Sequence, residues 1–322
     1  MCLYLALSPV PEETFNRNTD ASATTTRRYA PWRGGHGGVR MGLTPINEAE
    51  WLVDPTSIFH ADIGLISRRA AKAEQYGTNP TNVYGVIDAP STHAAINELC
   101  VLVKGHVSSR GCWSAQPRVP PLIEAALNVA EDLCVLLPTL QYNGDSEDTD
   151  YALVAAALFA PSFWRLAEKL GAPLRDIHSP VASLESKLGT RMRAFLKQLP
   201  AQRIFTRGNW NLHFAAEQFH PHPDGWHQAS TLTEKNIGEL LCMRSERQTL
   251  MKLPNTGAMV FTILVFVEPL NALLDDPTLL ADVWQAYQAM PDAVQKDRHF
   301  PEISRALHGW LTRHDVPLDD GA

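Results

Sequence analysis

The longest nearly unbroken apolar run of the sequence is GAMVFTILVFV, at residues 257–267. It is too short to cross a bilayer, which needs about 20 residues, and its β-branched and aromatic residues favour a strand. Residues 239–254 (ELLCMRSERQTLMKLP) are also β-rich, and the following Pro254-Asn255-Thr256-Gly257 is typical of a turn. The fold therefore has to accommodate two strands that a turn joins.

Two further segments predict a hairpin. EDLCVLLPTLQY (131–142) and YALVAAALFA (151–160) flank the turn-rich NGDSEDTD, and one strand is expected to be buried on both faces. Residues 202–214 add another β-rich segment. Helices are expected in a stretch beginning at Thr44-Pro45 and in residues 57–75, 91–108, 161–171 and 183–199, with two more within 270–314. This order predicts an α+β fold with a largely antiparallel sheet rather than alternating β–α–β units.

Composition excludes several classes of protein. Hydrophobic residues make up 45%, so the chain is not mainly disordered. The 28 Lys+Arg against 35 Asp+Glu give a net charge of −7, which disfavours nucleic acid and anionic membrane surfaces as partners. No dinucleotide or P-loop motif and no signal peptide is recognisable. The cysteines have no CxxC spacing and are interpreted as reduced thiols of a cytoplasmic protein: Cys2, Cys100, Cys112, Cys134 and Cys242.

Histidines are the first candidates for a functional site. His213, His220, His222 and His227 cluster around a stiff HPHP segment, which we interpret as a polar loop rather than a metal site. His178 precedes Pro180 on a turn, where a structural role is favoured over a functional one.

Two arginine-bearing segments are more suggestive. Arg207 lies in TRGNW beside Trp210, and Arg247 lies in RSERQTLMK. Alternation along a strand places Arg247 and Thr249 on one face and Gln248 on the other. A buried guanidinium needs an anion beside it. An internal salt bridge, for instance to Glu131, Asp132 or Glu246, is favoured over an anionic ligand such as a cofactor carboxylate.

Several segments together resemble a known family, the haem-dependent oxidative N-demethylase alpha-subunit-like proteins. These segments are MGLTPINEAEWLVD (41–54), Arg68-Arg69, AEDL (130–133), APSFWRLAEKLGAPLRDIHSPV (160–181), TRGNW (206–210) and SERQTLMKLPNTGAMVFTI (245–263). The resemblance implies a PAS-like fold, in which haem b lies between an antiparallel sheet and flanking helices. The polar, glycine-rich composition of residues 11–40 predicts a flexible lead-in at 1–40. The resemblance implies a single large haem-binding catalytic domain at 41–314, followed by a tail at 315–322.

The resemblance also implies an activity, which is oxidation of a small secondary amine, dimethylamine, to a primary amine and formaldehyde. The reaction uses O2 and electrons from NADPH that flavin and iron–sulfur partner polypeptides deliver. The absence of a nucleotide motif agrees with a separate reductase, and peroxide is an alternative oxidant. A PAS-type haem sensor and a haem-free binding protein remain the alternative functions.

The resemblance assigns site residues with one departure. The family's proximal histidine is expected in an R-x6-H segment, but here Tyr76 stands in that position after Arg69. Tyrosinate can ligate ferric haem and disfavours its reduction. His60 is the alternative ligand, His93 is a poorer one, and loss of haem is a further alternative. Arg207 and Arg247 are expected to hold propionates or brace the pocket, with Trp210 beside them. His178 and Thr256 are expected near cofactor or substrate. Tyr151 and Glu131 are expected on the distal side, where Glu131 would bind an ammonium group or pair with Arg207.

Overall fold

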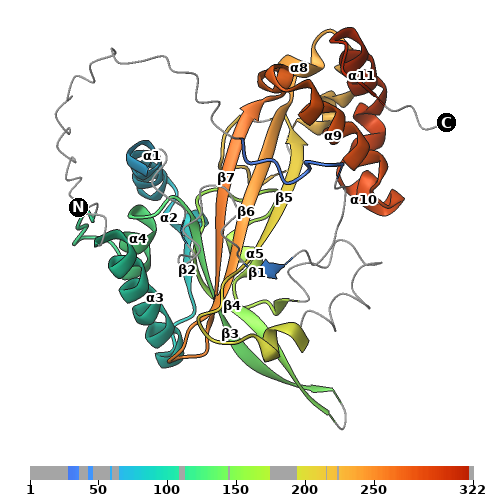
Figure 1. Ribbon diagram of the computed structural model, residues 1–322. Coiled ribbons are helices and arrows are strands. Elements are labelled where there is room, and N and C mark those ends of the chain that lie inside the picture. The colour runs from blue at the N-terminus through green and yellow to red at the C-terminus, as the bar shows by residue number, and fades with distance from the viewer. Residues whose placement is uncertain are drawn as a thin grey trace, which may run out of the picture.

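The computed structural model describes residues 28–35, 43–45, 59, 65–108, 113–143, 146–174, 194–214, 216–222 and 225–318. A seven-stranded antiparallel sheet in the order β1-β5-β6-β7-β3-β4-β2 forms its centre (Figure 1). The strands are β1 (Thr44–Pro45), β2 (Tyr84–Val86), β3 (Asp132–Asn143), β4 (Ser146–Ala157), β5 (Phe205–His213), β6 (Cys242–Lys252) and β7 (Met259–Pro269). The predicted α+β class, the hairpin and the β6–β7 pair are confirmed.

One group of helices covers the end of the sheet that contains β3, β4 and β2 (Figure 1). It comprises α1 (Leu65–Thr78), α2 (Pro80–Val83), α3 (Pro90–Ser108) and α4 (Pro121–Leu127). Ala95, Leu99 and Val103 of α3 recur every fourth residue, and they pack into one core with Leu133 and Val260 of the sheet. The predicted helix at 91–108 is confirmed, and α1 confirms the second part of the predicted helix at 57–75.

A second group of helices packs at the other end, against β5 and β6 (Figure 1). It comprises η1 (Trp226–Thr231), α8 (Ile237–Leu240), η2 (Leu270–Asp275), α9 (Pro277–Gln288), α10 (Asp292–Asp297) and α11 (Phe300–Arg313). Trp284, Tyr287 and Trp310 build its core together with Trp210 of β5. The two helices predicted within 270–314 are confirmed as α9 and α11, and the structure adds α10 between them. No helix in the described part of the chain is long and apolar enough to span a membrane.

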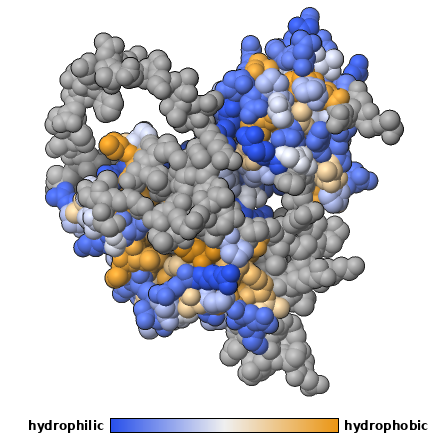
Figure 2. All heavy atoms as spheres, in the orientation of Figure 1, coloured by the Kyte–Doolittle hydropathy of each residue, from blue (hydrophilic) through white to orange (hydrophobic). Residues whose placement is uncertain are grey.

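The two cores draw on the same face of β6. Met243 belongs to the C-terminal core and Met251 to the core beneath α3, and both lie on the set of alternate residues that includes Arg247. The opposite face of the sheet carries a third core beneath α5 (Leu166–Lys169), with Phe205, Leu250 and Ile263. On the side shown in Figure 2, hydrophilic residues predominate over the C-terminal helices, and apolar residues reach the surface where α3 lies.

Residues 28–35 correct part of the expected flexible lead-in. Trp32 is fully buried in the C-terminal core, and its indole Nε1 donates to the Leu279 carbonyl at 3.1 Å. Arg28 forms ion pairs with Glu268 at 2.7 Å and Asp275 at 2.8 Å. The burial of one tryptophan thus outweighs the turn-rich composition around it. Thr44-Pro45 is also a strand, paired with β5, and not the predicted start of a helix.

The contact between this segment and β5 can be tested at Gly208. A Cβ there would lie 2.2 Å from Pro31 Cβ. We expect Gly208→Ala to displace residues 28–32 and to lower the free energy of unfolding by about 1–3 kcal/mol. The control is Gly105→Ala in α3, where a Cβ meets nothing within 4 Å and the change should stabilise the helix by about 0.5–1 kcal/mol. Denaturant unfolding measures both, and equal effects would contradict the expected close contact.

Candidate functional site

Two neighbouring strands, β5 and β6, carry a run of polar residues on the sheet face opposite the one that Trp210 and Met243 present to the C-terminal core. Cross-strand partners share a face, and the register pairs Arg207 with Gln248, Asn209 with Glu246, Asn211 with Arg244, and His213 with Cys242. We call these eight residues the polar face. All four members from β6 are buried. Buried polar side chains need hydrogen-bond partners, so the polar face is stable only where its side chains bind one another or the neighbouring backbone.

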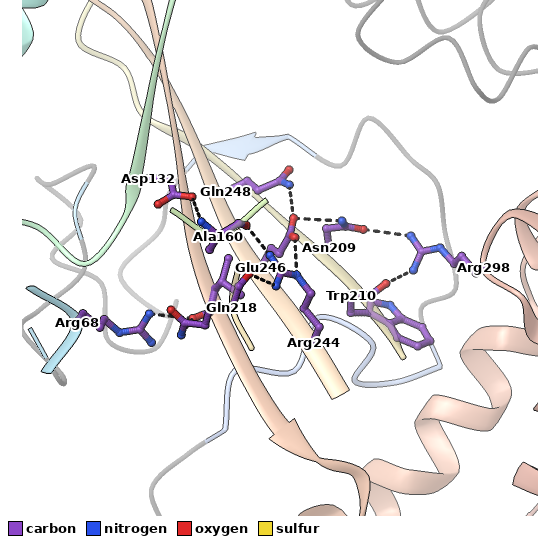
Figure 3. A network of polar contacts seen from close by, with 11 residues as sticks. Arg68, Asp132, Ala160, Asn209, Trp210, Gln218, Arg244, Glu246, Gln248 and Arg298 are labelled. Carbon is purple, nitrogen blue, oxygen red and sulfur yellow. Dashed lines mark hydrogen bonds and ion pairs between the residues drawn. The ribbon is translucent and has the colours of Figure 1, made fainter. Parts of the chain in front are cut away.

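The Glu246 carboxylate lies at the centre of the polar face (Figure 3). Its Oε1 accepts from Arg244 Nε at 3.2 Å, and its Oε2 accepts from Gln248 Nε2 at 2.9 Å and Asn209 Nδ2 at 3.2 Å. Arg298, which follows α10, reaches the same group through the Asn209 side-chain oxygen at 3.1 Å. Contacts of this kind are typical of a fully satisfied buried carboxylate.

Positive charge exceeds negative charge around this carboxylate. Burial lowers the pKa of Arg207 and of Arg298, and the charge of Glu246 opposes that shift in both. Arg244 is the third guanidinium beside Glu246. The buried Nε of Arg207 has no hydrogen-bond partner within the described part of the chain. A buried donor without a hydrogen-bond partner costs free energy, so this end of the polar face is suited to an acceptor such as an anionic group.

Arg244 also holds two loops against the polar face. Its Nη2 donates to the Ala160 carbonyl at 2.6 Å and its Nη1 to the Gln218 carbonyl at 2.9 Å (Figure 3). The Ala160 N–H in turn donates to Asp132 Oδ2 at 2.8 Å. One side chain, 1% exposed, therefore fixes the segment after β4 and the segment after β5.

The structure separates the histidine cluster into two buried and two exposed members. His213 is 1% exposed and stacks on Phe163, with ring centroids 4.3 Å apart, and its centroid lies 5.5 Å from that of His220. Burial, and then the charges of Arg244, His220 and Arg298, hold the pKa of His213 well below its ordinary value. His222 and His227 are exposed. Across the described ranges, no three His, Cys, Asp or Glu side chains are grouped to hold a metal ion.

A second buried ionic cluster lies where α1 meets the start of β3. Lys72 Nζ donates to the carbonyls of Ala126, Val129 and Glu131 at 3.1, 3.2 and 2.6 Å, and it lies 4.0 Å from Asp132 Oδ1. Burial, which outweighs the carboxylates nearby, lowers the pKa of Lys72 to about 8. The charge of Glu131 opposes the lowering of the pKa in both Lys72 and Arg68.

The two arginines expected beside the haem lie on opposite faces of the sheet. Arg207 pairs with Gln248, whereas Gly208 pairs with Arg247, so adjacent register positions separate them. Arg247 does share the face of Thr249, whose hydroxyl contacts Thr262 at 2.5 Å. Trp210 is buried in the C-terminal core, with its ring centroid 5.6 Å from Trp32.

The remaining expected residues are dispersed. Thr256 Oγ1 donates to Glu98 Oε2 at 2.6 Å, which ties the β6–β7 turn to α3. Tyr151 is buried in the third core, and burial raises its pKa. Tyr76 is half-buried against the core under α3, and its ring meets Tyr84 edge-on at 6.5 Å. His60 and His178 lie outside the described residues.

Asn209, Arg244 and Arg298 are not among the site residues that the sequence predicts. A signal existed for Arg244, because Arg244, Glu246 and Gln248 occupy alternate positions of one strand. Arg298 had none, since it follows a short helix far along the chain from β5.

Arg244 provides the first test of the network. We expect Arg244→Lys to lower the free energy of unfolding by about 2–4 kcal/mol, because an ammonium cannot reach Glu246 and both loop carbonyls together. The control is Arg165→Lys on an exposed arginine, which should change stability by less than about 0.5 kcal/mol. Urea unfolding measures both variants. If Arg244→Lys lowers the free energy of unfolding by no more than the control does, the hydrogen bonds of Arg244 to the two loops are not needed for stability.

Lys72 predicts a dependence of stability on pH. Its pKa is about 8 in the folded protein, against an ordinary value of 10.5 for a lysine in water. Between these values the unfolded chain retains a proton that the folded protein has released, so the stability due to this group rises with pH. We expect wild type to gain stability relative to Lys72→Met over this range. The exposed Lys296→Met control should show no such trend, and a flat wild-type difference would contradict the assignment.

A known protein family matches the part of the chain that contains this geometry. The family model described as haem-dependent oxidative N-demethylase, alpha subunit-like, matches residues 109–308. That range contains β3 to β7 and the whole polar face, and it leaves Tyr76 and His60 outside. The match covers well over half of the chain. The protein therefore belongs to the haem-dependent oxidative N-demethylase alpha-subunit-like family.

Proposed function

We propose that this protein is a haem-dependent oxidative enzyme that demethylates or otherwise oxidises a small amine, and that the polar face holds a carboxylate of the haem. Family membership supports the chemistry. The single observation that carries the location is the surplus of arginine around Glu246, with Arg207 Nε lacking a hydrogen-bond partner in the described residues. Two propionates are the anionic groups that haem b offers to such a site.

The residues present fit this group in part. The buried Nε of Arg207 is a donor without a hydrogen-bond partner in the described ranges, which suits a carboxylate. Tyr76 does not share that site, because it packs on Tyr84 at the start of β2. In the strand order, β2 lies five spacings from β5, which is about 24 Å at about 4.8 Å per spacing. Tyr76 is therefore remote from a haem that Arg207 would hold, so we propose His60 as the first residue to test for holding the iron, with Tyr76 as the alternative.

Haem, when bound, supplies O2 activation and oxidation of the substrate. The chain's own residues would hold and shield it. Arg207 would bind a propionate, and the hydrogen bonds of Arg244 to the two loops would keep water from the polar face. Phe205 and Leu250, which lie beside Arg207 and Gln248 on the same face, would contribute an apolar wall, and Tyr151 belongs to the same core on β4. Glu131 would brace Arg68 and Lys72, whose pKa values its charge raises, and binding of an ammonium group remains its alternative role. Thr256 would hold the turn.

The proposal includes a PAS-like topology, a cytoplasmic location and a separate electron donor. Electrons would come from NADPH through a flavin or iron–sulfur partner, or peroxide would replace both. The sequence offers no dinucleotide loop and no CxxC pair that would carry such a relay within the chain.

Haem titration tests the cofactor and its anchor. We expect a Soret band at about one haem per chain, and Arg207→Met should weaken haem affinity about tenfold or more, the value of a lost hydrogen bond to a charged group. Arg305→Met, an exposed arginine of α11, is the matched control. His60→Ala should alter the ferric spectrum and Tyr76→Phe should leave it unchanged; the reverse would return the ligand to Tyr76. No Soret band would favour a haem-free binding protein.

Formaldehyde release then tests the reaction. The haem-loaded protein is incubated with dimethylamine under NADPH alone, under NADPH with a surrogate reductase and ferredoxin, and under peroxide. Product is expected in the second or third condition. Product with NADPH alone would refute the need for a partner, and no product in any condition would favour a sensor.

A further inference from the structure

Two loops lie together over the His213 end of the polar face. The backbone N–H of Phe163 donates to the His220 carbonyl at 2.8 Å, and that of His220 donates to the Pro161 carbonyl at 3.2 Å. Arg244 binds the carbonyls of Ala160 and Gln218 in the same two loops. We call residues 160–163 and 218–221 the latch.

The latch is held closed in a conformation that costs free energy. Phe163 has a φ of +59°, in the left-handed region that residues with a Cβ rarely adopt. Its ring is stacked on His213 and meets His220 at an angle, with centroids 4.3 and 5.2 Å away. The aromatic contact with His213 therefore helps to keep Phe163 in an unfavourable backbone conformation.

We propose that protonation of His213 opens the latch, so that the polar face is closed at neutral pH and becomes accessible in mild acid. This proposal rests on the proposed function, in which the polar face is a binding site, and it concerns how access to that face is regulated. The same regulation applies whether the anion at Arg207 is a haem carboxylate or another group.

The surroundings of His213 make the closed latch intolerant of a proton. Arg244 faces His213 from β6, His220 faces it from the latch, and Arg298 faces it from the end of α10. The positive charge of each of these groups opposes protonation of His213. Its cross-strand neighbour Cys242 is neutral and faces Glu217. The ring Nε2 is buried and has no hydrogen-bond partner among the described residues.

The direction of the effect follows from linkage. In the open state His213 is in water, where its ordinary pKa is 6.5, whereas the closed state holds the pKa well below that value. The open state therefore binds more protons, and it is favoured progressively as the pH falls below about 6.5. The new charge also repels Arg244, the side chain that clamps both loops.

Cys242 reports on the latch, because it is 5% exposed and lies directly opposite His213. The haem-free protein is treated with dithiodipyridine at about pH 7.5 and about pH 5, on either side of the ordinary histidine pKa. Peptide mass spectrometry gives the labelling rate of each cysteine relative to the denatured chain at the same pH. Cys134, which is 4% exposed in β3, reports on general unfolding.

In wild type, we expect labelling of Cys242 to rise at least about tenfold in acid, as for one unit of pH acting on a single proton, while Cys134 stays protected. His213→Phe keeps an aromatic ring that cannot titrate and should abolish the rise. His213→Gln should also abolish the rise. If circular dichroism shows that His213→Phe is misfolded, the labelling of His213→Gln is the test of the proposal. His227→Gln, an exposed histidine, should respond like wild type.

Three results would overturn the proposal. They are an unchanged Cys242 rate in wild type, a rise that persists in a folded His213 variant, and a parallel rise at Cys134, which would mean global unfolding. Because no haem is present, failure here is distinct from failure to bind haem or to oxidise an amine.

Discussion

The Glu246 carboxylate is the interaction on which the rest of the site depends. It is the negative group at the centre of a buried sheet face that also holds Arg207 and Arg244, and Arg298 approaches it from the C-terminal helices. Without it, Arg207, Arg244 and Arg298 would all lose a carboxylate that offsets the cost of their burial. Glu246 also affects the positions of both latch loops. It orients the guanidinium of Arg244, and that guanidinium holds the carbonyls of both loops.

The polar contacts form a continuous path across the sheet. The path starts at Lys72 in α1 and passes through Asp132, Ala160 and Arg244 to Glu246. It continues through Asn209 to Arg298 beside the C-terminal helices (Figure 3). Both helical groups are thus tied to one buried network in addition to their separate apolar cores. An anion bound at Arg207 would relieve charge repulsion in a network that both groups share.

Local patterns in the sequence predict the positions of four of the long strands. The runs that became β3, β4, β6 and β7 are apolar, are separated by turn residues and are paired antiparallel as expected. Alternation correctly separated Arg247 and Thr249 from Gln248. Alternation within one strand does not fix the register between two strands, so it could not reveal that Arg207 and Arg247 face opposite sides. Nor could it show that Glu131 lies beside Arg68 and Lys72, because that contact depends on how α1 docks.

The burial of Trp32 has a consequence for how the chain reaches its native state. Its hydrogen bond to Leu279 joins residues 247 positions apart, and Arg28 reaches Asp275 across the same interval. Closing so large a loop costs chain entropy before any contact compensates it, and contacts of this range slow folding. During synthesis the segment 28–35 leaves the ribosome long before α9 exists to receive it. The earliest part of the described chain should therefore be among the last to dock, once the C-terminal helices have formed.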